Sequence, residues 1–156
     1  MKNDPYTLTV ALSKAGDAKG ELYMDDGYTF AHEKGELVWR GLEAKTDKKT
    51  SHLVLSSRDL AREKPDMTVN QVDLVAYDAS QNSYAKSIAN VRFEKVVILG
   101  LGNMPKSIKT GDGRIPQWSW TNGVKAKSGK DGEASVLVIK DPGLLVTKDW
   151  ELIIEQ

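Results

Sequence analysis

The apolar residues of this 156-residue chain fall mostly at every second position, in short runs rich in Val, Ile, Leu, Thr, Tyr and Trp. This spacing is typical of β-strands, because alternate side chains of a strand point to opposite faces. The pattern predicts strands near Tyr6–Leu12, Gly20–Met24, Tyr28–His32, Glu36–Ala44, Thr50–Ser56, Val91–Leu99, Lys106–Thr110, Gln117–Trp120, Ala134–Lys140 and Trp150–Glu155. We therefore predict an all-β fold, an antiparallel β-sandwich of about ten short strands.

Turn dipeptides separate several of the predicted strands. They are Asp26-Gly27, Asp112-Gly113, Asn122-Gly123 and Asp131-Gly132. Glycine accepts the positive φ that tight hairpins require. The dipeptides support short connections between neighbouring strands.

The length and the 40% share of apolar residues predict a single domain, residues 1–156, with one core. Residues 58–89 break the alternation and are predicted to form a surface insertion. Its flanks, Arg58–Pro65 and Asp78–Ser83, are dense in charged or polar residues and are expected to be mobile loops. Its middle, Val69–Tyr77, is compatible with either a further strand or a loop.

The charge balance and the apolar runs argue against two classes of partner. The chain has 22 basic and 22 acidic residues, so no global field attracts nucleic acid. Its longest apolar runs, such as Val96–Leu99, are far shorter than the roughly 20 residues that cross a bilayer, so no membrane partner is expected. The absence of cysteine excludes disulfides and thiolate chemistry but does not indicate a compartment.

No metal or cofactor site is predicted. His32 and His52 are the only histidines, and neither has a ligand cluster near it in the sequence. The stretch Ile98–Gly102 resembles the glycine turn of a dinucleotide site, but Pro105 follows and no amphipathic helix succeeds it. We therefore expect no cofactor.

The adjacent carboxylates Asp25 and Asp26 invite comparison with the acid pair of a glycosidase. Such a pair must flank a bond at about 5–10 Å, whereas neighbouring strand residues point to opposite faces. With Gly27 next in the chain, we interpret the two residues as shaping a structural turn. A calcium site would need more oxygen ligands than this stretch supplies.

Two tryptophans, Trp118 and Trp120, are spaced to lie on one face of a strand. They are interpreted as core aromatics. The alternative is a stacking platform for a sugar ring.

Three sequence blocks resemble one known family. Gly20–Phe30 reads G-E-L-Y-M-D-D-G-Y-T-F, Glu94–Gly100 reads E-K-V-V-I-L-G, and Ser135–Gly143 is followed by Asp149-Trp150. This pattern resembles the C-terminal, distal β-sandwich of the family 31 glycoside hydrolases, which are α-glucosidases. The resemblance is greatest to the members that trim glucose from N-glycans in the endoplasmic reticulum.

The resemblance implies a non-catalytic accessory domain that stabilises a catalytic barrel. In this family the catalytic aspartates lie on a (β/α)8 barrel N-terminal to the domain, so no catalytic residue is carried onto this chain. Implied partners are the barrel, other domains of a parent chain and a regulatory β subunit, in the endoplasmic reticulum lumen. Two alternatives remain, a carbohydrate-binding module that uses Trp118 and Trp120, and a subunit-interaction module.

Overall fold

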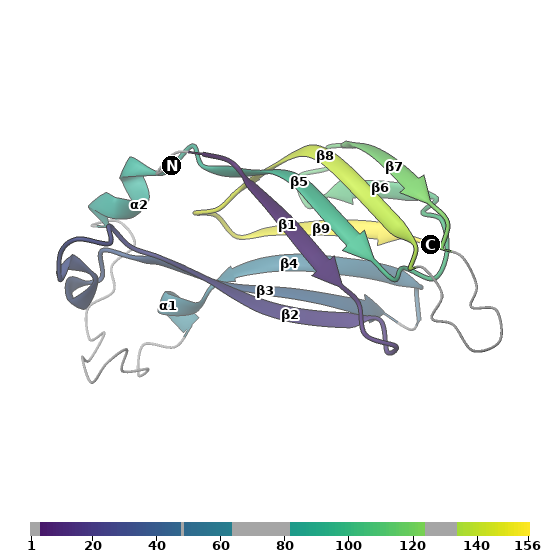
Figure 1. Cartoon of the computed structure of the whole chain (residues 1–156), viewed down its shortest axis with the longest axis horizontal. Coiled ribbons are helices and arrows are strands. Elements are labelled where there is room, and N and C mark those ends of the chain that lie inside the picture. The colour runs from purple at the N-terminus through teal and green to yellow at the C-terminus, as the bar shows by residue number, and fades with distance from the viewer. Residues whose placement is uncertain (1–3, 48, 64–81, 124–133) are drawn as a thin grey trace.

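The computed structural model describes residues 4–47, 49–63, 82–123 and 134–156 as two facing β-sheets (Figure 1). The described strands are β1 (Tyr6–Ala11), β2 (Asp17–Met24), β3 (Val38–Asp47), β4 (His52–Asp59), β5 (Arg92–Leu99), β6 (Ser107–Thr110), β7 (Gln117–Thr121), β8 (Val136–Leu145) and β9 (Trp150–Glu155). A 3-10 helix, η1 (Ala31–Lys34), and two short α-helices, α1 (Leu60–Glu63) and α2 (Ser83–Ser87), complete the described elements.

The strand order confirms the predicted sandwich. One sheet has the order β1-β5-β8-β7 and the other has the order β2-β3-β4-β9-β6. All strand pairs are antiparallel except β1 and β5, which run parallel. The N-terminal strand therefore departs from a purely antiparallel sheet.

The strand predicted near Tyr28–His32 is wrong. The chain bends there and enters η1, which ends at Gly35 with φ +83°. The preceding Gly27 also has a positive φ, +68°. The side chain of Asp26 accepts hydrogen bonds from the backbone N–H groups that follow it. These local bonds take the place of the hydrogen bonds that a strand would make to a neighbouring strand.

The core lies between the sheets and is supplied by their central strands. Their inward positions are fully buried, with exposed fractions of 0–1% at Val96, Ile98, Leu137, Ile139, Leu53, Leu55, Leu152 and Ile154. Each side chain of this size contributes about 1.5–3 kcal/mol when fully buried. The period-two pattern in the sequence therefore corresponds to the real inner faces of both sheets.

A second, smaller cluster lies on the outer face of β3. It consists of Leu37, Trp39, Leu60 and Ala61. Gly41 makes room for it, because a Cβ atom there would lie 2.9 Å from the Leu60 side chain. Leu60 and Ala61 were expected to lie in a mobile flank of the insertion. Instead, α1 packs them against the sheet because they are the apolar residues of that flank.

The end of the predicted insertion, which follows the flank Asp78–Ser83, is also packed into the domain. Tyr84 on α2 and Ile88 directly after the helix are buried in the main core, and the side chain of Asn82 caps the helix by accepting from the Ala85 N–H at 2.8 Å. The predicted insertion at residues 58–89 thus contributes to the body of the domain at both ends. Its boundaries stay a prediction, and Val69–Tyr77 lies outside the described residues.

A bulge in β8 makes Gly143 a position with little tolerance for substitution. Its φ is +69°, and a Cβ atom would overlap the guanidinium of Arg114, which donates to the Gly143 carbonyl. We expect Gly143→Ala to lower the free energy of unfolding by about 1–2 kcal/mol, mainly through left-handed backbone strain. Thermal melting measures this.

Gly20→Ala is the matched control. Gly20 lies in β2, and a Cβ atom there would meet nothing within 4 Å. Its melting temperature should stay close to that of the unmodified chain. Equal destabilisation by both variants would show that the strain argument is wrong.

Candidate functional site

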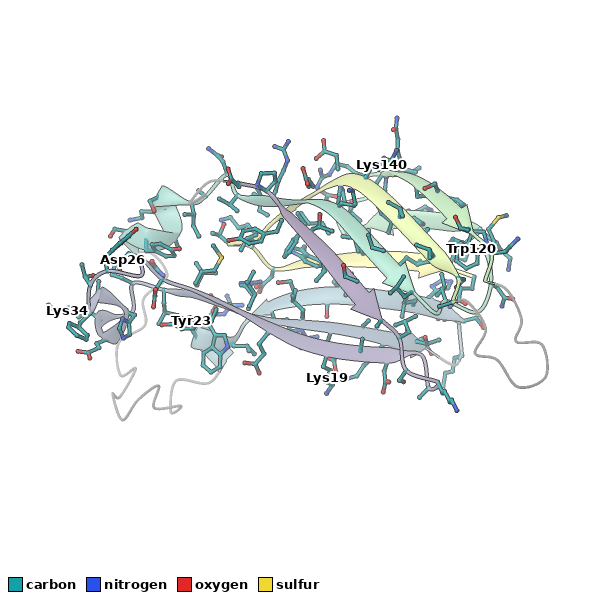
Figure 2. All side chains as sticks on the ribbon, in the orientation of Figure 1. Lys19, Tyr23, Asp26, Lys34, Trp120 and Lys140 are labelled. Atoms are coloured by element: carbon teal, nitrogen blue, oxygen red, sulfur yellow. The ribbon has the colours of Figure 1, made fainter. Side chains whose placement is uncertain are left out.

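The carboxylates singled out in the sequence lie in the connection between β2 and β3, residues 25–37. The two strands pair directly up to Met24 and Val38, so Asp25, Asp26 and Gly27 begin this connection. A tight hairpin was expected here. The longer connection instead projects from one end of the sandwich, as the position of Asp26 in Figure 2 shows.

Both carboxylate oxygens of Asp26 accept hydrogen bonds from the same loop. Oδ1 accepts from the N–H groups of Tyr28 at 3.1 Å and Thr29 at 3.0 Å, and Oδ2 accepts from the Thr29 hydroxyl at 2.6 Å. These hydrogen bonds lower the pKa of Asp26 to about 2, and the bond from the Thr29 hydroxyl makes the largest contribution. Its carboxylate is therefore occupied in holding the loop.

Asp25 also bonds within the loop. Its Oδ1 accepts from the Gly27 N–H at 2.8 Å, and its Oδ2 lies 3.9 Å from Nδ1 of His32. Burial, followed by the charge of Asp25 and a hydrogen bond to it, raises the pKa of Tyr23 to about 12.

The far end of the connection is joined to α2. A Glu36 carboxylate oxygen accepts from the Ser83 hydroxyl at 2.9 Å and from the Tyr84 N–H at 2.7 Å. The Tyr84 N–H is the main reason that the pKa of Glu36 is lowered. The Asn82 amide donates to the Leu37 carbonyl. The loop is therefore fixed at both of its ends.

The lowered pKa of Asp26 does not suit the general acid of a glycosidase, which must hold its proton near neutral pH and so needs a raised pKa. Both carboxylate oxygens of Asp26 and one of Asp25 accept hydrogen bonds from the loop itself. The hydrogen bonds favour a structural role for Asp25, Asp26 and Gly27. That role stays a prediction until the variants are measured.

The low pKa of Asp26 predicts a specific titration. Its stabilising hydrogen bonds should be present above the ordinary aspartate value of 3.8 and be lost only as pH falls through about 2. In an NMR titration, the Asp26 carboxyl carbon should still report an ionised group at pH 3. In Thr29→Val, which lacks the hydroxyl, the midpoint should rise. A midpoint near 3.8 in the unmodified chain would contradict the described loop.

The connection also exposes aromatic residues that the sequence reasoning missed. Tyr28 is 95% exposed and Phe30 is 77% exposed. The alternation of Tyr28 and Phe30 with Thr29 and Ala31 was interpreted as a strand, which would have buried one face. The signal against a strand was the Asp-Asp-Gly-x-Thr sequence, whose side chains bond to nearby backbone groups.

Trp118 and Trp120 lie on β7, with Trp120 near the opposite end of the sandwich from Asp26 (Figure 2). Both are half-buried and pack against the main core, and the Trp120 indole donates to Asn122 Oδ1 at 2.7 Å. Trp150 also packs on this core, edge-on to Phe93 with ring centroids 5.7 Å apart. These contacts favour the core interpretation, and sugar stacking stays untested.

A cleft in the described part of the chain has a volume of about 710 Å³ and lies beside the loop between β6 and β7. Its charged lining residues are Arg58, Arg114, Lys148, Asp112, Asp149 and Glu151. Three basic and three acidic residues give the cleft no net sign that would select a charged ligand.

A buried arginine next to this cleft joins the elements of one sheet. Arg40 is 2% exposed, and its guanidinium donates to Asp149 Oδ1 at 2.6 Å, to the Lys148 carbonyl at 2.7 Å and to the Ser57 hydroxyl at 3.1 Å. Asp149 also accepts from Arg62 at 2.8 Å. The cluster links β3, β4 and the turn before β9 to α1.

Within the described ranges, no three His, Cys, Asp or Glu residues are placed to hold a metal ion together. Among the same residues, no helix combines the length and the apolar character that crossing a membrane requires.

Comparison with known proteins identifies relatives over nearly the whole chain. Neutral alpha-glucosidase AB of Dictyostelium discoideum is 32% identical over 150 residues, which cover 96% of this chain and 12% of the relative. Neutral alpha-glucosidase AB of Mus musculus is 30% identical over 152 residues, which cover 97% of this chain and 13% of the relative. No family model matches the chain.

Solved structures agree with this match. A crystal structure of glucosidase II alpha subunit with bound Tris shares the fold with a TM-score of 0.69 and 25% identity, covering all of this chain and 15% of that one. A heterodimeric complex of ER glucosidase II, made of the catalytic subunit and the binding domain of the regulatory subunit, matches with a TM-score of 0.65 and 24% identity.

The fold and these matches define the chain as a β-sandwich domain of a glycoside hydrolase. More narrowly, it is a domain of a family 31 glucosidase, and its homologues are glucosidase II alpha and neutral alpha-glucosidase AB. The family resemblance noted in the sequence is thereby confirmed. The chain spans only about an eighth of the length of the curated relatives that it matches.

Proposed function

We propose that this chain is a non-catalytic accessory domain of an α-glucosidase that trims glucose from N-glycans in the endoplasmic reticulum. Its role is to stabilise the catalytic barrel of the same polypeptide. The observation that carries the proposal is the extent of the sequence match. Nearly all of this chain aligns with each relative, but the aligned region is only about an eighth of that relative. A region of this size in a much longer glucosidase leaves ample length for a separate catalytic domain.

The chemistry of the candidate site supports this role. The carboxylates of Asp25 and Asp26 accept hydrogen bonds from their own loop, and the pKa of Asp26 is lowered rather than raised. An acid that must protonate a glycosidic oxygen requires the opposite shift. The loop is therefore better suited to holding a fixed shape than to transferring protons.

The experiment uses the complete polypeptide encoded by the gene that contains this sequence. It should hydrolyse an α-glucoside, and the double variant Asp25→Asn/Asp26→Asn should keep its kcat within about twofold, because neither residue touches the reacting bond. The melting temperature of the same variant reports any structural effect. A loss of kcat of about 100-fold or more in a variant that remains folded would contradict the proposal.

A gene that encodes only these 156 residues would contradict the proposal as well. So would a complete polypeptide without activity on any α-glucoside, since the domain would then have no glucosidase barrel to support.

A further inference from the structure

Two aromatic side chains stand clear of the fold at one end of the molecule. Tyr28 and Phe30 are the most exposed large apolar residues in the described part of the chain, at 95% and 77%. They lie in the first part of the connection between β2 and β3, residues 25–34, here called the aromatic loop. Clustered exposed aromatics on a soluble protein mark an interaction surface more often than single exposed apolar residues do.

The aromatic loop is held in shape without a partner. Asp26 accepts from Tyr28 N–H, Thr29 N–H and the Thr29 hydroxyl. The hydroxyl of Thr29 in turn accepts from the Ala31 N–H at 3.2 Å, and η1 follows directly. A loop that is already ordered loses little conformational entropy on binding. Tyr28 and Phe30 are therefore presented as preformed anchors.

Strand β1 begins at the same end of the domain as this loop (Figure 1). Figure 1 shows the start of β1 at the same end as α2 and the connection between β2 and β3. Tyr6, Asp25 and Asp26 all lie near enough to Tyr84 on α2 to act on it electrostatically. The first described strand therefore begins at the end where the aromatic side chains are exposed (Figure 1).

The charge of the aromatic loop constrains the surface that it would meet. Its acidic residues are Asp25, Asp26 and Glu33, whereas Lys34 is its only lysine and the loop has no arginine. A complementary surface would combine an apolar socket for the two rings with basic side chains at its rim.

We infer that the aromatic loop is the surface by which this domain docks onto the catalytic part of its own polypeptide, with Tyr28 and Phe30 seated in an apolar socket. The inference rests on the proposed function and specifies which part of the domain carries it. The length of the relatives indicates what contacts the loop, because about seven-eighths of each relative lies outside the matched region and includes ample chain for a docking surface. An intramolecular partner also explains how such exposed rings are tolerated, since the socket is present at high effective concentration.

Hydrogen exchange in two forms of the protein tests this docking. In the isolated 156-residue chain, the amides of residues 25–34 give a reference rate. In the complete polypeptide the same amides should exchange at least about tenfold more slowly, because the docked surface excludes solvent and suppresses local opening. Tyr28→Ser/Phe30→Ser should abolish this additional protection.

The double variant is also measured for folding and heat stability. In the isolated chain its melting temperature should be unchanged, because both rings are already in water. In the complete polypeptide the temperature of half-inactivation should fall by about 5 °C or more. Met104→Ser/Ile115→Ser is the matched control, since these residues are 60% and 72% exposed but lie outside the loop. The control should leave both temperatures unchanged.

Equal hydrogen-exchange rates at residues 25–34 in the isolated chain and in the complete polypeptide would overturn the inference. The proposed function would still stand if the complete polypeptide hydrolyses an α-glucoside. Equal effects of the two double variants on half-inactivation would overturn the inference as well. Protection in the isolated chain that grows with its concentration would assign the loop to a second copy. Protection on adding a glucosylated mannose oligosaccharide would assign it to sugar. Either result would replace the inferred occupant.

Discussion

Replacing Asp149 by alanine should lower the free energy of unfolding by about 3 kcal/mol. The reason lies in its partner, because the Arg40 guanidinium is buried and would lose its counter-charge while remaining out of water. Removing one member of a buried ion pair typically costs about 3–5 kcal/mol. The Asp149 side chain is itself 47% exposed, so water can compensate in part and the lower end of the range applies. For a domain of this size the melting temperature should fall by about 6–12 °C.

Lys19→Ala provides the control for this prediction. Lys19 pairs with Glu43 at 3.0 Å, but its side chain is 74% exposed, so the loss should be about 0.5 kcal/mol. Chemical denaturation of the two variants under identical conditions gives the comparison. Similar losses for both would mean that Arg40 does not depend on Asp149.

The effect of Asp149→Ala should also depend on pH. Burial acts to raise the pKa of Asp149, but the hydrogen bond and charge of Arg40, followed by those of Arg62, outweigh burial and lower it. The pair therefore stabilises the fold above the ordinary aspartate pKa, and this contribution is lost as pH falls through the lowered value. The stability difference between the unmodified chain and the variant should narrow in acid.

Ile88→Ala should cost about 3 kcal/mol, because Ile88 is 1% exposed and packs in the main core between the sheets. Removing its outer carbons leaves a cavity that neighbouring strands cannot fill by small shifts. Denaturant unfolding measures the loss, and the slope of the transition should be unchanged because the same surface becomes exposed.

Lys86→Ala, on the adjoining helix α2, is the matched control for Ile88→Ala. Lys86 is exposed, so its replacement should change the free energy of unfolding by about 0.5 kcal/mol or less. If Ile88→Ala were as mild as Lys86→Ala, the segment that follows α2 would not belong to the core.

The sheets were predictable because their pattern is local. Alternation places Val96 and Ile98 on one face of β5, and Leu137 and Ile139 on one face of β8, and all four are buried. The parallel pairing of β1 with β5 was not predictable in this way. Register and direction depend on which strands meet in space, and period two contains no information about direction.

The predictions from sequence that proved wrong or incomplete have a common physical origin. In each case a side chain binds nearby backbone groups or packs against an element that is distant in the sequence. Tyr28–His32 alternates like a strand, yet the bonds of Asp26 turn it into a loop. The polar surroundings of Leu60, Tyr84 and Ile88 suggested a surface insertion, but the side chain of each of these residues packs into an apolar cluster. Asp149 gives no sequence signal for its contact with Arg40, because 109 residues separate the two along the chain.

The central claim is that this glucosidase domain acts through packing rather than through chemistry. Its most direct test is to measure the release of chromophore from a chromogenic α-glucoside by the purified 156-residue chain. The account predicts a rate equal to that of buffer, because the carboxylates of Asp25 and Asp26 are bound to their own loop and the pKa of Asp26 lies at about 2. Turnover that persists through purification and disappears in Asp25→Asn or Asp26→Asn would contradict it.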